Sequence, residues 1–226
     1  SRTEVPQRPD IAELLKDYKG EEQVAQGEAF DPSPANIESR TTKIQVPGGL
    51  ELALLPKLTR GNVVSAQLTF RFGDEQSLQN KGAIPSFTAS MLNKGTTTRT
   101  RQQIKDEFDR LNARVSVGGG ANQVVVSIET IKDNLPEVIK IVADIMKNPK
   151  FDPQELEKLR QEEITGIESQ RSEPQALAVT EFRRRTSPYK KGDPRYAGTF
   201  DEDLEDIRKV TADDLKQFYK DFYGAS

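Results

Sequence analysis

The sequence of 226 residues contains neither cysteine nor histidine. Without cysteine, the chain cannot form a disulfide, a thiol nucleophile or a thiolate metal site. Without histidine, it has no imidazole ligand for zinc, no Ser-His-Asp triad and no imidazole general base. Any catalysis would therefore depend on carboxylate, lysine, tyrosine, serine or threonine side chains, as in glycosidases and carboxylate-metal enzymes.

Long apolar runs and a strong net charge are missing as well. No stretch of about 18 apolar residues occurs, so the sequence predicts no membrane insertion. The N-terminal SRTEVPQRPD has no basic stretch followed by an apolar one, so export would require a signal upstream of Ser1. The 33 Lys and Arg residues nearly balance 36 Asp and Glu, and this net charge of −3 predicts no general attraction to nucleic acid.

The composition divides the chain into an arm and a domain. Prolines interrupt residues 1–39, where IAELLKDYK, between a capping Asp10 and a terminating Gly20, is the one helix indicated. The remainder of this stretch is loop-like and predicts a linker arm. Strand and helix patterns then follow one another, which predicts a single domain over residues 40–226.

Strand patterns occupy much of the first half of this domain. Residues 41–56 and 113–130 each hold two strand-like segments around a turn, Pro47-Gly48-Gly49 and Gly118-Gly119-Gly120, and each predicts an antiparallel hairpin. Between them, residues 63–72 alternate apolar and polar side chains, as a half-buried strand does. The predicted buried face of that strand consists of Val64, Ala66, Leu68, Phe70 and Phe72.

Capping signals and helical periodicity predict the helices. Thr100 with Gln103, and Thr211 with Asp214, have the spacing of capping boxes. Asp152-Pro153-Gln154-Glu155 is a strong helix start, with a capping Asp, a proline at the first position and a Glu to close the box. The predicted helices cover residues 84–94, 101–112, 135–146, 153–171, a segment after Pro174, and two short segments after the loop 187–198.

The helix over 135–146 shows the clearest amphipathic pattern. Its apolar stripe consists of Leu135, Val138, Ile139, Val142, Ile145 and Met146. Strands gathered early and helices gathered late favour an α+β fold over a doubly wound sheet.

Two clusters invite a functional interpretation. Gly118-Gly119-Gly120 lies between two predicted strands, whereas a phosphate-binding loop needs its glycines between a strand and a helix, so a turn or bulge is favoured. The predicted helix 153–171 carries several carboxylates, which suit acid–base chemistry or a hard cation. They are Glu155, Glu157, Glu162, Glu163 and Glu168. Interleaved Lys158 and Arg160 favour a solvated helix face instead.

Two further groups are weaker candidates. Arg183-Arg184-Arg185 and Lys190-Lys191 have no alternating aromatic residues, which favours a solvated or interface surface over nucleic-acid binding. Ser86, Ala89 and Ser90 share one helix face, but only lysine or a carboxylate could activate their hydroxyls, so close packing is favoured. Residue types alone therefore predict a non-catalytic domain, with no catalytic, cofactor-binding or metal-binding residue.

Four segments, in their order, resemble the insulinase-type (M16, pitrilysin) zinc peptidases. They are GAIPSFTASMLNKGTTTRT, LNARVSVGGGANQVVVSIET, LPEVIKIVADIMKNPKFDPQELEKLRQEEITGIESQRSEP and VTADDLKQFYKDFY. The resemblance covers residues 40–226, the length of one domain of that family. Active members carry H-x-x-E-H followed by a run like M-L-x-K-G-T, then a Glu ligand on a later helix and a Pro soon after.

In this chain, residues 91–96 (MLNKGT) hold the frame of that run, although Gly82 stands one place off the usual spacing. The resemblance then puts Ser86 and Ser90 where the ligand histidines would be, and Ala89 where the general-base Glu would be. No histidine exists to complete the site in either register, so the resemblance also predicts a domain that cannot bind the family's zinc.

The alignment leaves more than one position open for the family's third zinc ligand. Counting back from Pro174 puts Gly166 at this position, while a shifted alignment would put Glu162, Glu163 or Glu168 there.

The resemblance implies a processing-peptidase-like α+β domain, an antiparallel sheet with helices mainly on one face. It is most similar to the degenerate third domain of two-half bacterial members, with residues 1–39 as the linker between the halves. Tyr223–Ser226 would then precede the strand that begins a further domain. Zinc would be held in the catalytic half, in the same chain or a partner subunit.

Under this interpretation, the domain helps to enclose and position a peptide substrate. Because the arm is similar to the junction of exported bacterial members, the expected location is the periplasm. Two alternatives remain. The first is a stand-alone peptide- or protein-binding scaffold that has lost peptidase activity. The second is an active carboxylate hydrolase, which would need two acids in one pocket with raised pKa values.

Overall fold

The computed structural model describes residues 26–224. The helix predicted within residues 11–19 lies outside this range. The helices are α2 (Pro34–Arg40), α3 (Ile84–Met91), α4 (Arg101–Arg110), α5 (Leu135–Lys147), α6 (Pro153–Arg171), α7 (Pro174–Thr186), α8 (Phe200–Lys209) and α9 (Ala212–Phe222). The strands are β1 (Thr42–Val46), β2 (Leu50–Leu54), β3 (Val63–Arg71), β4 (Arg114–Gly119) and β5 (Gln123–Ile131).

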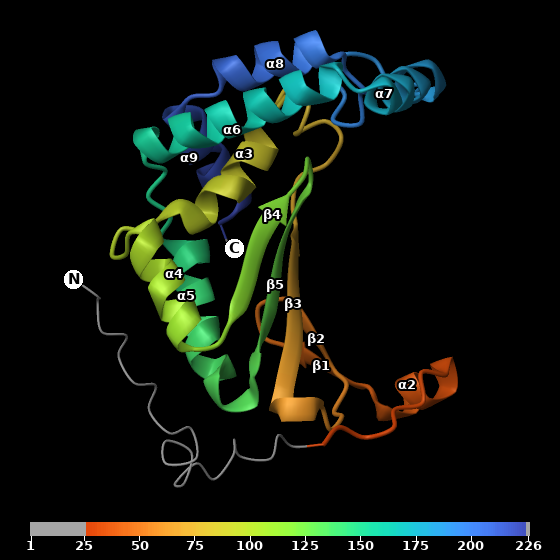
Figure 1. Ribbon diagram of the computed structural model, residues 1–226, viewed down its shortest axis with the longest axis vertical. Helices are drawn as coiled ribbons and strands as arrows, with labels where there is room; N and C mark the ends of the chain where they lie inside the picture. Colours follow the sequence, from red (N-terminus) through yellow and green to blue (C-terminus); the bar gives the residue numbers. More distant parts are fainter. Residues whose placement is uncertain (1–25, 225–226) are drawn as a thin grey trace, which may run out of the picture.

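The central sheet is antiparallel, in the order β3-β5-β4. Leu68 of β3 and Val117 of β4 both lie opposite Val126 of β5, so the three side chains share one face. Val126 is fully buried on that face, whereas Ser127 and Glu129 on the other face are exposed. Figure 1 shows α4 and α5 along one side of this sheet, with α3, α6, α8 and α9 at one end. The predicted α+β fold, with helices mainly on one face of an antiparallel sheet, is confirmed.

Both predicted hairpins are confirmed. β1 pairs with β2 as a separate two-stranded sheet, and β4 pairs with β5. In the first hairpin, Ile44 lies opposite Leu52 and Val46 lies opposite Leu50, so its large apolar side chains share one face. That face is open within residues 26–224, and Leu50 is 51% exposed.

The predicted buried faces are wrong at two positions. Phe70 is 40% exposed because it lies on the outer strand β3, while Val124 opposite it on the central strand is fully buried. Ile139 of α5 is 44% exposed, and Ile141 is buried instead. Ile139 is rotated by about 100° from Val138 around the helix axis, which turns it away from the sheet.

The prediction of a loop up to residue 39 is wrong from Pro34 on, because these residues begin the helix α2. Ser33 caps this helix by accepting a hydrogen bond from the Asn36 N–H, and Pro34 occupies its first turn. The guanidinium of Arg40 at its end pairs with Glu28 at 2.9 Å and donates to the carbonyl of Pro56 at 2.6 Å. These contacts attach the end of the predicted arm to the chain beside the first hairpin.

The helices α4, α6 and α9 begin at the capping residues that the sequence indicates. Both capping boxes, Thr100 with Gln103 and Thr211 with Asp214, are formed. Asp152 caps α6 by accepting from the Gln154 N–H at 2.8 Å. Glu155 does not close a box there, since its carboxylate instead pairs with Lys158 at 2.6 Å.

The helices α6 and α8 lie side by side across the end of the molecule (Figure 1). The guanidinium of Arg160 in α6 donates to the carbonyls of Ile207 and Val210, the second at 2.7 Å. Carbonyls at a helix C-terminus lack partners within the helix, so Arg160 both caps α8 and attaches it to α6. Within residues 26–224, no helix is both long enough and apolar enough to cross a membrane.

Candidate functional site

The helix α3 is where the family's zinc ligands would stand. Ala89 is fully buried, and Ser86 and Ser90 are half-buried. The Ser86 hydroxyl donates to the carbonyl of Ala83 at 3.0 Å, so it is already engaged within the helix. These three side chains offer two hydroxyls and a methyl group, a donor set that does not fit zinc.

Close packing against β4 explains why position 89 holds an alanine. A Cβ atom placed on Gly119 of β4 would lie 2.8 Å from the Ala89 Cβ and 2.5 Å from the Gln123 carbonyl oxygen. The helix therefore approaches the strand as closely as two small residues allow. The close-packing interpretation is confirmed at Ala89.

The glycine triplet has a different place from the one predicted. Gly118 and Gly119 belong to β4, and the connection to β5 consists of Gly120, Ala121 and Asn122. Placing the turn at all three glycines is therefore wrong, because the contact with α3 requires a glycine inside the strand. The strand position also leaves no loop of glycine N–H groups for a phosphate.

The carboxylates of α6 do not converge. Glu162, Glu163 and Glu168 are exposed, and Gly166 is exposed with open space beside it. Among residues 26–224, no three His, Cys, Asp or Glu side chains are arranged to hold a metal ion. The statement that the whole chain has no metal site stays a prediction.

The acids at the start of α6 are paired with bases. Hydrogen bonds from Lys158 and Arg101, opposed by burial, hold the pKa of Glu155 below its ordinary value. Hydrogen bonds from Gln161 and Arg160 do the same for the pKa of Glu157. A general acid needs a raised pKa, so this helix face favours the solvated interpretation over a carboxylate hydrolase.

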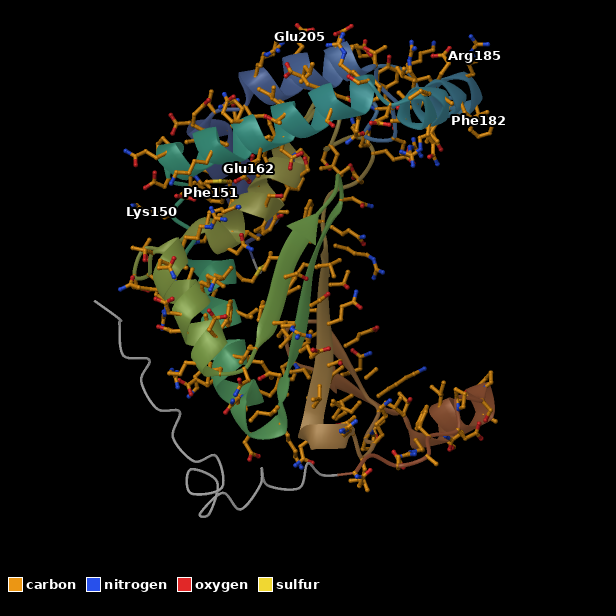
Figure 2. The ribbon with its side chains drawn as sticks, viewed as in Figure 1. Lys150, Phe151, Glu162, Phe182, Arg185 and Glu205 are labelled. Carbon is orange, nitrogen blue, oxygen red and sulfur yellow. The ribbon has the colours of Figure 1, made fainter. Side chains whose placement is uncertain are left out.

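The basic stretch lies on α7 and the loop that follows it. Arg184 and Arg185 pair with Glu181 at 2.9 and 2.7 Å, and Lys191 pairs with Glu202 at 3.2 Å. Figure 2 shows Arg185 and Phe182 pointing away from the body of the molecule. Phe182 is 67% exposed, so α7 carries an apolar group beside its charges that the charge pattern alone did not indicate.

A groove beside β4 is the feature that sequence analysis missed. It has a volume of about 930 Å³ and is lined by α4 and by residues of all three strands of the central sheet, β3, β5 and β4. Ile104 and Phe108 of α4 border it but are themselves buried in the core, whereas Val115 of β4 is half-buried. We call it the β4 groove. No residue within 26–224 pairs with the outer edge of β4, so the backbone groups on that edge are unpaired within this range.

The strand order accounts for the missing signal. β4 lies at the edge only because β5 passes between it and β3, and neither alternation nor turn residues specify that order. An unpaired strand edge can accept a further strand, with main-chain hydrogen bonds supplying affinity and side-chain positions supplying specificity.

The loop that leads into α4 is held rigidly beside this groove. The carboxylate of Asp144 in α5 accepts hydrogen bonds from the Thr96 and Thr98 hydroxyls at 2.9 and 3.1 Å, and from Arg99 at 2.7 Å. Burial raises the pKa of Asp144, but hydrogen bonds from Asn148 and these groups outweigh it, so the pKa lies below its ordinary value. Asp144 therefore stays ionised and holds the loop in place.

Residues 54–192, more than half of the chain, match the family described as insulinase, peptidase family M16. The chain belongs to this family. An uncharacterized zinc protease of Rickettsia felis is 28% identical over 119 residues, which are 53% of this chain and 29% of the relative. The β subunit of the mitochondrial-processing peptidase of Dictyostelium discoideum is 26% identical over 131 residues, or 58% of this chain and 28% of that subunit. This M16 chain thus spans less than a third of the length of these relatives.

Solved structures share the fold of this chain. A peptidase M16 inactive domain from Pseudomonas fluorescens has a TM-score of 0.67 at 23% identity, over 79% of this chain and 42% of that one. The periplasmic protease PqqL from Escherichia coli has a TM-score of 0.64 at 20% identity, over 88% of this chain and 22% of PqqL. The first half of PqqL gives 0.62 at 20% identity, over 82% of this chain and 40% of that half.

Proposed function

We propose that this chain is a non-catalytic M16 domain that helps to enclose and position a peptide, while zinc-dependent cleavage occurs in a catalytic half elsewhere in the protein. The observation that carries the proposal is on α3. The helix and the MLNKGT run fit the family frame, yet Ser86, Ala89 and Ser90 stand where H-x-x-E-H would. Imidazole, thiolate or carboxylate ligands are what zinc requires. The likeness to an M16 domain described as inactive supports the same conclusion.

The β4 groove supports the peptide-positioning part of the proposal. An extended peptide added to the outer edge of β4 would form main-chain hydrogen bonds with that strand. No catalytic group is needed for this role, because a bound strand is aligned by backbone pairing alone.

The comparisons support a larger parent protein. Aligned parts of this chain cover 40% of one half of PqqL and 22% of the whole, as expected for one of several similar domains. We therefore propose a catalytic M16 half as the partner, in the same chain or in another subunit. The periplasm is proposed as the location, because PqqL is described as a periplasmic protease.

Metal analysis tests the non-catalytic part. The purified chain should contain no stoichiometric zinc and show no chelator-sensitive peptidase activity, since neither His nor Cys is present. One equivalent of tightly bound zinc by elemental analysis would overturn this part of the proposal.

Hydrogen exchange tests the peptide-positioning part. A ten-residue peptide, about the length of a long strand, that alternates Val and Gln should slow amide exchange in β4. β3 is the matched control, because it is the other outer strand of the same sheet. The same peptide with every backbone nitrogen methylated should have no effect. If the first peptide slows amide exchange in neither β4 nor β3, this result counts against the proposed peptide-positioning role.

A stand-alone binding scaffold is the second candidate, and the β4 groove is compatible with it. Residues 1–226 should be mixed with an M16 catalytic half encoded in the same genome. A rise in kcat/KM of that half supports the catalytic partnership. Peptide binding without any effect on kcat/KM favours the scaffold.

A further inference from the structure

The first hairpin has an apolar face that stays open within residues 26–224. The register of its two strands gathers apolar side chains on one side, which we call the hairpin face: Ile44, Val46, Leu50, Leu52 and Leu54. Of these, Leu50 is 51% exposed and Leu54 is 45% exposed. The other side carries polar groups, and the Gln45 amide donates there to the Glu51 carboxylate at 2.9 Å. The hairpin is therefore amphipathic, with its apolar side open in the described part of the chain.

The hairpin has little support from the rest of residues 26–224. Figure 1 shows β1 and β2 at the end of the molecule opposite α6 and α8. The extensive contacts of β1 and β2 are with each other, and none of their residues belongs to the buried core. A two-stranded hairpin alone is at best marginally stable in water, and it needs another element packed on its apolar face. The hairpin face therefore has the character of a contact surface.

The chain enters the described range beside this hairpin. The Glu28 N–H donates to the Leu58 carbonyl at 3.0 Å, and the Glu28 carboxylate accepts the Leu58 N–H at 3.1 Å. Gly27 lies against the same segment, since a Cβ added to it would be 3.1 Å from the Arg60 nitrogen. Leu58 follows β2 and is 69% exposed. The attachment point of residues 1–25 is therefore fixed close to the hairpin face.

Residues 1–25 contain a segment whose pattern matches this face. The helix predicted at residues 11–19 repeats apolar residues at i, i+3, i+4 and i+7: Ile11, Leu14, Leu15 and Tyr18. These four positions share one face of a helix, whereas Glu13 and Lys16 lie on the opposite side. The sequence thus offers a second amphipathic element next to the amphipathic hairpin.

The dimensions of the two elements are compatible. Residues 20–25 reach up to about 20 Å when extended, whereas a strand of five residues such as β2 is about 17 Å long. A helix over residues 11–19 would be about 14 Å long, so it fits along the hairpin. So short a helix is not stable alone in water. The helix and the hairpin would therefore each gain from contact with the other.

We propose that residues 11–19 form a helix that packs on the hairpin face, with Leu14 and Leu15 at the centre of the contact. Two marginal elements then stabilise each other by burying apolar surface that both otherwise expose to water. The segment that composition assigns to a linker arm becomes an integral part of the domain. The proposal is independent of the peptide-positioning function, because the hairpin forms its own sheet and contributes no residue to the β4 groove.

A single tryptophan reports on the segment directly. The chain contains no Trp, so Tyr18→Trp gives the full chain one indole. Its emission should lie at shorter wavelength than in urea, and iodide should quench it less, because the packed indole is shielded from water. Leu52→Asp, in the centre of the hairpin face, should move both values to those measured in urea. Ala53→Asp, on the polar side of the same strand, is the matched control and should leave both values unchanged.

Substitutions in the segment itself avoid unfolding the hairpin directly, because they leave residues 26–224 unchanged. Leu14→Gln with Leu15→Gln should raise the amide exchange rates of β1 and β2 about tenfold, since the hairpin loses its cover. Glu13→Gln with Lys16→Gln is the matched control, because it places the same good helix former on the opposite side at the same net charge. This control should leave the exchange rates unchanged.

The contrary outcomes are distinct. An introduced indole as accessible to iodide as in urea would overturn the proposal, and so would equal exchange rates in the two double variants. Sedimentation identifies the competing occupant, a second copy of this chain. A dimer that Leu52→Asp dissociates, but that Leu14→Gln with Leu15→Gln leaves intact, would assign the hairpin face to self-association and overturn docking of residues 11–19.

Discussion

At the scale of single residues, Gly119 sets the distance between α3 and the central sheet. Because Gly119 has no side chain, the Ala89 methyl group and the Gln123 carbonyl oxygen can both lie close to it. The neighbouring Gly118 and Gly120 have no heavy atom within 4 Å of an added Cβ. The three adjacent glycines therefore have different roles, and substituting each of them by alanine distinguishes these roles.

We expect Gly119→Ala to lower the free energy of unfolding by about 1–3 kcal/mol, because the new methyl group overpacks a site with no room. Gly118→Ala and Gly120→Ala should cost little or stabilise by up to about 1 kcal/mol, since alanine lowers the entropy of the unfolded chain. Urea unfolding at neutral pH measures all three. Equal effects at the three positions would contradict the contact with α3.

At the scale of elements, the apolar stripe of α5 faces the core. Its buried positions Val138, Ile141, Val142 and Ile145 follow the helical repeat, while Ile139 is 44% exposed. One face of the helix is therefore committed to the sheet and the other to water.

Val142→Asp should lower the free energy of unfolding by at least about 3 kcal/mol, because it buries an unpaired carboxylate. Ile139→Asp, on the exposed side of the same helix, should cost less than about 1 kcal/mol. Circular dichroism and urea unfolding measure both. If Val142→Asp remains as stable as the unsubstituted chain, the stripe does not face the core.

The start of α8 supplies a pH-dependent element. Hydrogen bonds from the Thr199 N–H and from Lys191, opposed by burial and assisted by Tyr196, lower the pKa of Glu202 from 4.5 to about 2. The folded state thus favours the ionised carboxylate. Its contribution to stability is fully present above pH 4.5 and is lost as the pH falls towards about 2.

Glu202→Gln should reduce the loss of stability between pH 4.5 and about 2, the window of this shift. Glutamine can still accept the Thr199 N–H, so the helix cap survives while the titration is removed. Urea midpoints across this pH range measure the effect, with Glu38→Gln of α2 as an exposed control. A profile that Glu202→Gln leaves unchanged would assign the acid sensitivity to other groups.

At the scale of the whole molecule, the predicted alignment with the family's metal ligands depends on how α3 and α6 lie together. Figure 1 shows α6 passing beside α3, and both helices contribute to one core. Ser86 and Ser90 lie one turn apart and are half-buried, so side chains introduced there have room to turn outwards. Ala89 has no such room, because it is fully buried against β4.

A triple variant tests the alignment with the active family members. Ser86→His, Ser90→His and Gly166→Glu together should bind zinc measurably, with an affinity limited by missing partners for the new imidazoles. Ala89 is left unchanged because a carboxylate there would be buried. Competition with a chromogenic chelator measures the affinity, and peptidase activity should stay absent. If the double variant without Gly166→Glu binds zinc equally well, Gly166 is not the position of the lost ligand.

Much of this architecture could be predicted because its signals are local. A capping box such as Thr100 with Gln103 involves residues three positions apart; the boxes predicted for α4 and α9 are formed, whereas the one predicted at Asp152 with Glu155 is not. Alternation in β3 and helical periodicity in α5 likewise depend on near neighbours. The lack of histidine is decided by composition alone, and it excludes the family's H-x-x-E-H site under any fold.

The tertiary structure decided what depends on distant neighbours. Phe70 and Ile139 fit their patterns, but their exposure depends on which element covers each side of a strand or helix. Gly119 has its role through Ala89 of another element, and β4 is an outer strand because β5 lies between it and β3. Local propensity specifies helices and strands, whereas strand order and close approach come from contacts that form only once the chain has folded.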